Sequence, residues 1–166
     1  TSSEVETNSM GEYTLDTTGM KAPFVITVTK LLGDKQIELY SVASNADGVA
    51  NVSPLTTAVS ALLSANGSYD PKSISSSAVT DEGIQAATEK IATSLGNLMT
   101  AANVSASSFN PVGATFTADG TGIDSLLDRI SVDFTSAGVQ ISNKFVPLTD
   151  NSSVVASVGI TANANP

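Results

Sequence analysis

The side chains of this sequence that could do chemistry are carboxylates, and three of them lie close together in the stretch DGTGIDSLLD. They are Asp119, Asp124 and Asp128. Calcium takes about six to eight oxygen ligands, many of them carboxylates, so this stretch is a candidate calcium site. A structural interpretation is also open, because the spacing differs from that of an EF-hand loop. In it, Asp119 and Gly120 form a turn, Thr121 and Asp124 form a helix capping box, and Asp128 faces solvent.

The absence of histidine and cysteine excludes whole classes of reaction. No Ser-His-Asp or Cys-His catalytic site can form, nor can a zinc, haem or iron–sulfur site that depends on these ligands. The sequence also lacks a Gly-x-Gly-x-x-Gly motif and a P-loop. A glycosidase needs two opposed carboxylates, which the sequence alone does not pair, and there is no tryptophan for sugar stacking. We therefore expect that the protein is not an enzyme and that calcium is its one candidate cofactor.

The charge balance restricts the partners. Sixteen acidic residues against seven basic ones give a net charge of −9, which disfavours nucleic acid and anionic membranes as partners. No run approaches the roughly 20 apolar residues of a transmembrane helix, so we expect no transmembrane segment. The sequence is rich in serine and threonine and only 14% charged, a composition common in secreted and surface proteins. We expect an extracellular or cell-surface location.

The elements that must position these residues begin with a helix in the stretch 51–67. Ser53 is a suitable N-cap, Pro54 fits the first helical position, and apolar residues follow at helical spacing. A second helix is predicted from the cap Thr80 to about Ala101. A short third helix is predicted after Thr121.

Strands are predicted on both sides of the helices. They cover residues 11–16, 24–30, 36–43, 131–135, 139–145 and 153–161. Strands followed by helices and further strands indicate an α+β fold, with antiparallel, sandwich-like strands and a central group of about three helices. We divide the chain into a partial β-sandwich module (1–50), a helical part (51–130) and a C-terminal hairpin with a last strand (131–166), together forming one compact unit.

Three segments carry a resemblance to known proteins. GEYTLDTTG followed by APFVITV resembles the closing half of carboxypeptidase-regulatory-like β-sandwich modules. NVSPLTTAVSALL and FNPVGATFTADGTGIDSLLDRISVDF are similar to segments of uncharacterised secreted or lipid-anchored bacterial proteins that carry such a module ahead of a helical part. The resemblance covers roughly residues 11–146 and implies a β-sandwich in a secreted bacterial protein. It implies no catalytic residues.

Such a module would begin with two or three more strands before Gly11, where this sequence has ten residues. The edge beside the Tyr13 strand would then lack a partner, and the last strand is a candidate donor from a neighbouring copy. The predicted interface residues are Tyr13, Leu15, Val154, Val155, Val158 and Ile160. We expect a structural subunit of an extracellular assembly, a dimer or filament joined by strand pairing or strand exchange. The alternative is a monomeric module of a larger surface protein that binds a glycan or a protein ligand.

Overall fold

The computed structural model describes residues 3–115, 117–135, 137–144 and 154–158. Its strands and α-helices are, in chain order, β1 (Phe24–Leu32), β2 (Lys35–Ala43), α1 (Pro54–Leu62), α2 (Asp81–Ala101), α3 (Gly122–Arg129), β3 (Ile130–Thr135), β4 (Gly138–Asn143) and β5 (Val154–Val158). Strands, then helices, then strands follow one another, so the predicted α+β class is confirmed.

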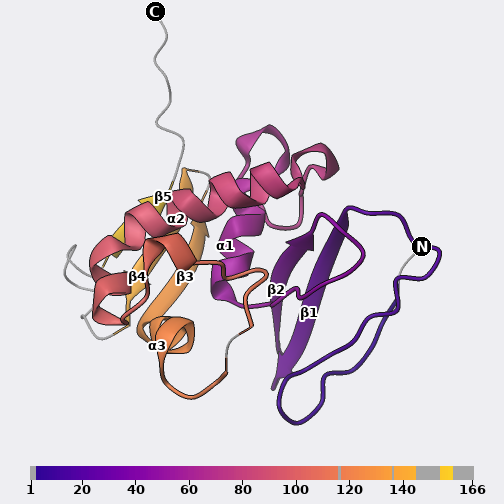
Figure 1. Cartoon of the computed structure of the whole chain (residues 1–166), viewed down its shortest axis with the longest axis horizontal. Helices are drawn as coiled ribbons and strands as arrows, with labels where there is room; N and C mark the ends of the chain where they lie inside the picture. Colours follow the sequence, from indigo (N-terminus) through magenta and orange to yellow (C-terminus); the bar gives the residue numbers. More distant parts are fainter. Residues whose placement is uncertain (1–2, 116, 136, 145–153, 159–166) are drawn as a thin grey trace, which may run out of the picture.

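Helix α1 is the centre of the fold. It lies between the β1–β2 hairpin and the sheet formed by β3, β4 and β5, and it contacts strands of both (Figure 1). Every residue from Leu55 to Ala61 is buried. The helix begins after the predicted N-cap Ser53, which forms a reciprocal capping box with Thr56. The helix ends at Leu62, earlier than predicted, and Asn66 and Gly67 adopt their positive φ angles in a separate turn.

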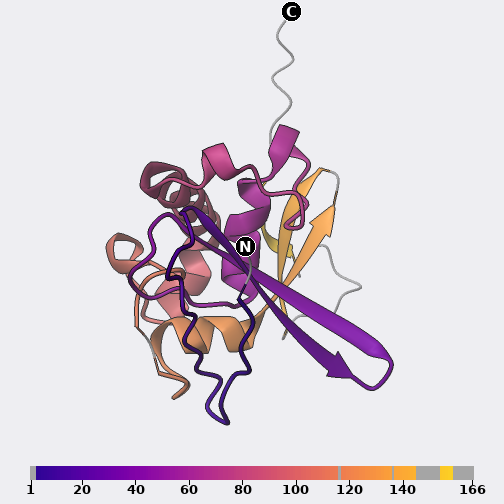
Figure 2. The same cartoon turned by 90° about the vertical axis from the view of Figure 1, so that its right-hand side faces the viewer.

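Strands β1 and β2 form an antiparallel hairpin that projects from the body of the molecule (Figure 2). Its register pairs Leu32 with Lys35 across a two-residue turn. Gly33 takes a φ of +62° at the first turn position, where glycine is preferred. The strands predicted for residues 24–30 and 36–43 are confirmed, and both are longer than the sequence pattern indicated.

The second sheet has the strand order β3-β4-β5, and both of its pairs are antiparallel. Val139 and Ile141 of β4 are fully buried, and α2 packs along β5. Helix α2 begins at the predicted cap, where the Thr80 hydroxyl accepts a hydrogen bond of 3.0 Å from the Gly83 amide. Ala87, Ile91 and Leu95, which recur at helical spacing, form its buried face.

The strand predicted for residues 11–16 is not formed. Instead, the Asn8 side chain accepts hydrogen bonds from the Met10 and Glu12 amides, which closes a tight turn just before it. The Tyr13 hydroxyl donates to the carbonyl oxygen of Ala50, so the segment is anchored by a side chain. With a two-stranded and a three-stranded sheet on either side of α1, the sandwich part of the fold prediction is not confirmed.

Candidate functional site

The two edges of the β1–β2 hairpin differ in how their backbone groups are satisfied. On the β2 edge, the Tyr40 amide donates to the Thr57 hydroxyl oxygen over 2.9 Å. The Tyr40 carbonyl accepts from the hydroxyls of Thr56 at 2.8 Å and Thr57 at 3.3 Å. Threonine side chains at the start of α1 therefore occupy this edge as a third strand would.

The β1 edge has no comparable contacts with the described residues. Residues of an antiparallel pair alternate between those that bond to each other and those that direct both backbone groups outward. Tyr40 points away from β1, so its partner Thr27 points away from β2, as do Val25, Thr29 and Leu31. Among the residues that the structure describes, no backbone hydrogen bond reaches these four from outside the hairpin. The edge therefore offers a row of unpaired N–H and C=O groups.

A groove of about 490 Å³ runs along this edge. One wall consists of Val25–Thr29, and the other side is lined by Ser3–Thr7 together with Tyr13 and Leu15. Successive side chains of a strand point to opposite faces, so a groove lined by five consecutive residues must follow the backbone edge rather than one face. The groove therefore has the form of a slot beside a strand.

The chemistry of the groove suits an uncharged extended chain. Strand β1 has no acidic residue, and Val25 is 51% exposed. Glu4 and Glu6 lie on the opposite wall. Burial raises the pKa of the Tyr13 phenol, which keeps the hydroxyl neutral as the donor to Ala50. An acidic segment would be repelled by the two glutamates, whereas a neutral one would not.

The predicted interface residues are placed as follows. Tyr13 and Leu15 line the groove from an irregular segment, and the strand edge beside the groove belongs to β1. Val154, Val155 and Val158 lie on β5, which pairs with β4 of the same chain. Ile160 lies outside the described residues.

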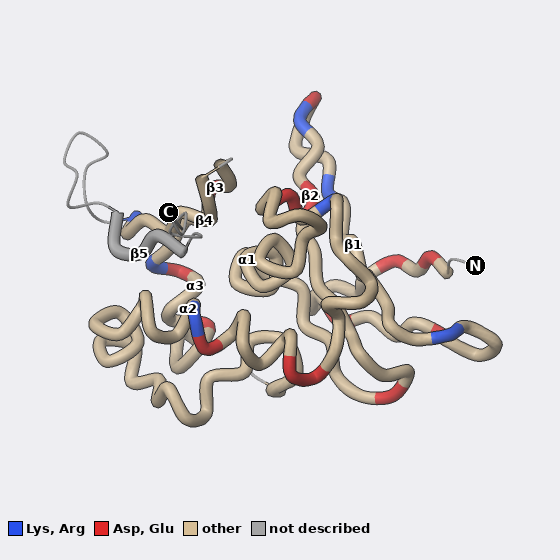
Figure 3. The backbone as a smooth tube through the Cα atoms, turned by 90° about the horizontal axis from the view of Figure 1, so that it is seen from above, with Lys and Arg blue, Asp and Glu red and all other residues tan. Residues whose placement is uncertain are grey.

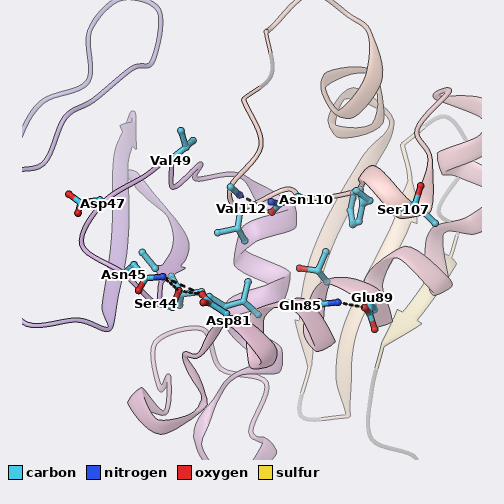
Figure 4. Close-up of a pocket in the computed structure, with 17 residues that line it drawn as sticks. Ser44, Asn45, Asp47, Val49, Asp81, Gln85, Glu89, Ser107, Asn110 and Val112 are labelled. Atoms are coloured by element: carbon cyan, nitrogen blue, oxygen red, sulfur yellow. Dashed lines mark hydrogen bonds between the residues drawn. The ribbon is translucent and has the colours of Figure 1, made fainter.

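A second depression, of about 530 Å³, lies between the end of β2, the first half of α2 and the segment 106–113 (Figure 4). Three carboxylates line it: Asp47, Asp81 and Glu89. Asp81 accepts hydrogen bonds from Ser44 and Asn45, and Glu89 accepts one of 2.8 Å from Gln85. Apolar side chains also line it, including Val42 and Val112, both buried. We call this depression the acidic pocket.

The predicted calcium residues do not converge. Asp119 accepts hydrogen bonds from the Thr121 hydroxyl and amide, which lower the pKa of its carboxyl group. Asp124 accepts from the Gly120 amide at 2.7 Å, and Asp128 lies exposed on α3. The predicted side-chain cap is wrong, because the Thr121 hydroxyl bonds to Asp119 instead of the helix. In the described part of the chain, no three acidic side chains are grouped so that they could hold a metal ion.

Comparisons with protein-family models, with curated proteins and with solved structures give no match for this chain. The resemblance to carboxypeptidase-regulatory-like modules therefore stays a prediction. None of the helices in the described residues combines the length and the apolar character needed to cross a membrane.

Proposed function

We propose that this protein is a non-enzymatic structural subunit of a bacterial cell-surface or extracellular assembly, in which copies associate by β-strand pairing or donation. The observation that supports the proposal is the free edge of β1 with the groove beside it. An extended segment laid in this groove would pair with the outward groups of Val25, Thr27 and Thr29. Each backbone hydrogen bond so gained stabilises by about 0.5–1.5 kcal/mol, and alternate side chains add contacts with the groove walls.

The donor we propose is the segment 154–161 of a neighbouring copy. Its sequence, VVASVGIT, is uncharged and rich in β-branched residues, so it suits a strand beside Glu4 and Glu6. Its residues 154–158 pair with β4 of their own chain in the monomer. Donation would therefore exchange one antiparallel partner for another, and the hydrogen bonds given up to β4 would be replaced by those to β1 of the neighbour.

The extracellular location is part of the same proposal. The sequence is rich in serine and threonine, and the chain is only 14% charged. An open strand edge promotes unwanted pairing, so a protein that keeps one is expected to use it.

The substitution Thr27→Pro tests the proposal. Proline removes the outward N–H of Thr27 and places a ring toward the incoming strand, but it breaks no hydrogen bond to β2. We expect association, followed by light scattering after size-exclusion chromatography, to weaken at least about tenfold. Thr27→Val is the matched control, because it keeps the amide and the strand propensity.

Two results would contradict the proposal. One is a wild-type protein that stays monomeric from about 1 μM to 1 mM, a range that covers weak specific association. The other is a Thr27→Pro variant that melts as a folded protein and associates as strongly as Thr27→Val.

A monomeric module that binds a glycan or a protein ligand is the second candidate function. The observation in its favour is the acidic pocket, whose amides and carboxylates could bond to hydroxyl groups. Phe109, an aromatic residue of its lining, is 6% exposed and gives a sugar ring little surface to stack on. A monomer whose melting temperature rises with added oligosaccharide would favour this function over assembly.

A further inference from the structure

The tip of the β1–β2 hairpin exposes apolar side chains that no intramolecular role explains. Leu31 is 70% exposed, Leu32 52% and Ile37 37%. Figure 2 shows that the hairpin end stands clear of the rest of the molecule. We call Lys30–Ile37 the hairpin tip.

The direction of these side chains limits what can cover them. Leu31 and Leu32 are consecutive strand residues, so they point to opposite faces of the hairpin. A flat surface could cover one of them only. Both are buried together only if the tip enters a depression or an apolar phase that surrounds it.

The charged residues of the hairpin tip indicate which of the two environments, a protein depression or a lipid phase, suits it better. Lys30 and Lys35 give the hairpin tip two of the seven basic residues of a chain whose net charge is −9 (Figure 3). The turn at the apex carries Asp34, which would enter a bilayer first, and an acidic side chain is costly there. The tip therefore suits a protein depression with an acidic rim better than lipid.

The acidic pocket is a depression with an acidic rim and an apolar surface. Asp47 and Glu89 on its rim are exposed, and Val49, which also lines it, is 47% exposed and supplies an apolar surface. A chain's own tip cannot reach it, because the pocket begins where β2 ends, and the nine residues of β2 span roughly 27 Å.

We propose that the hairpin tip of one copy docks into the acidic pocket of a second copy, with Lys30 and Lys35 facing Asp47 and Glu89. Tip and pocket are different surfaces of one chain, so the contact is heterologous and adds copies head to tail. The inference rests on the proposed self-association but concerns a different surface from the groove beside β1.

A charge exchange tests the contact. One variant carries Lys30→Glu and Lys35→Glu, and the other carries Asp47→Lys and Glu89→Lys. Each variant alone sets like charges against each other, so we expect each to lose at least about tenfold in association. An equimolar mixture restores both pairings, and association should return to within about threefold of wild type and weaken with salt. Both variants stay net negative, so general attraction between oppositely charged chains cannot explain a rescue.

Matched controls separate the contact from general effects. Lys21→Glu with Lys144→Glu makes the same change of charge away from both the tip and the lining of the pocket, and it should leave association unchanged. Leu31→Ser with Leu32→Ser should weaken association, whereas Met10→Ser, at a side chain 77% exposed elsewhere, should not.

The outcomes are distinct from those of Thr27→Pro. Tip docking is wrong if the equimolar mixture does not recover association, or if the two-leucine variant associates like wild type. The strand-pairing proposal is then judged by Thr27→Pro alone. If Thr27→Pro leaves association intact and the charge variants abolish it, the result supports tip docking and contradicts strand pairing at β1. Binding of the tip to neutral phospholipid vesicles, abolished when both leucines are replaced, would assign the tip to lipid instead.

Discussion

Two threonine hydroxyls distinguish the two edges of the hairpin. Thr56 and Thr57 belong to the first turn of α1, where threonine is only a moderate helix former. Both are fully or almost fully buried, and both bond to the backbone of Tyr40. Their polar atoms stabilise the β2 edge, whereas the hydroxyl of Thr27, the cross-strand partner of Tyr40, is exposed.

The substitution Thr57→Val measures this contact. It removes the acceptor for the Tyr40 amide and leaves a buried donor unpaired, so we expect a loss of about 1–3 kcal/mol in the free energy of unfolding. Thr27→Val, at the cross-strand partner of Tyr40, should be neutral or slightly stabilising. Chemical denaturation of both variants measures the difference, and equal losses would show that Thr57 does not satisfy the β2 edge.

A small charged cluster beside Tyr40 predicts a dependence on pH. Lys72 contacts Glu38 with a separation of 2.6 Å, and Tyr40 donates to the same carboxylate at 2.7 Å. These hydrogen bonds lower the pKa of Glu38, with that from Lys72 the larger. A carboxyl group whose pKa is lower in the folded protein stabilises it above the ordinary pKa and loses that effect as the pH falls through the folded value.

We therefore expect Glu38→Gln to melt slightly below wild type at pH 7 and to converge with it in acid. Melting curves recorded between pH 3 and 7 check this, with Glu6→Gln as the control for the loss of one carboxylate. A difference between wild type and Glu38→Gln that stays constant across this range would contradict the assignment.

At the scale of elements, α1 links both sheets. Leu55 in its first turn is fully buried, and the helix contacts β2 on one side and β3 and β4 on the other. Leu55→Ala should cost about 2–5 kcal/mol, because a cavity is left where neighbours from several elements meet. Leu62→Ala, at the partly exposed end of the helix, should cost less. Calorimetry that showed equal losses, or two separate transitions in Leu55→Ala, would contradict the central role of α1.

Elements with local signals could be predicted, and the others could not. The starts of α1 and α2 could be predicted because their signals, Ser53-Pro54 and Thr80-Asp81, act within one helical turn. Strands β1 and β2 could be predicted from their own residues and from the turn at Gly33. Apolar and polar residues alternate in 11–16 as they do in a strand. Whether such a segment pairs depends on a partner that is distant in the sequence, and no local pattern indicates that partner. In the irregular segment that forms instead, Tyr13 and Leu15 are half-buried, whereas Thr14 and Asp16 are exposed.

The candidate site illustrates the same limit. A free strand edge is defined by what does not lie beside it, so nothing within Phe24–Leu32 could indicate that the edge of β1 away from β2 lacks a partner. The pairing of β2 with Thr56 and Thr57 likewise depends on how α1 docks. The turn at Asp119 and the exposure of Asp128 could be predicted, but that the three aspartates do not converge needed the positions of Gly120 and Thr121.

At the scale of the whole molecule, two unsatisfied surfaces lie on the same hairpin. The edge of β1 has unpaired backbone groups beside a groove, and the tip beyond it exposes leucines flanked by lysines. The acidic pocket lies beyond the opposite end of the hairpin. A molecule with complementary features at its two ends can add copies in a line, which suits a structural subunit.

Amide hydrogen exchange, read residue by residue by NMR in dilute and concentrated solution, tests the central claim most directly. The inward amides of Ile26 and Val28 bond to β2 and should be protected at both concentrations. The outward amides of Val25, Thr27 and Thr29 should exchange freely when dilute and become protected as copies associate. If the protein associates while these three amides still exchange freely, the edge of β1 does not join copies, and the account is contradicted.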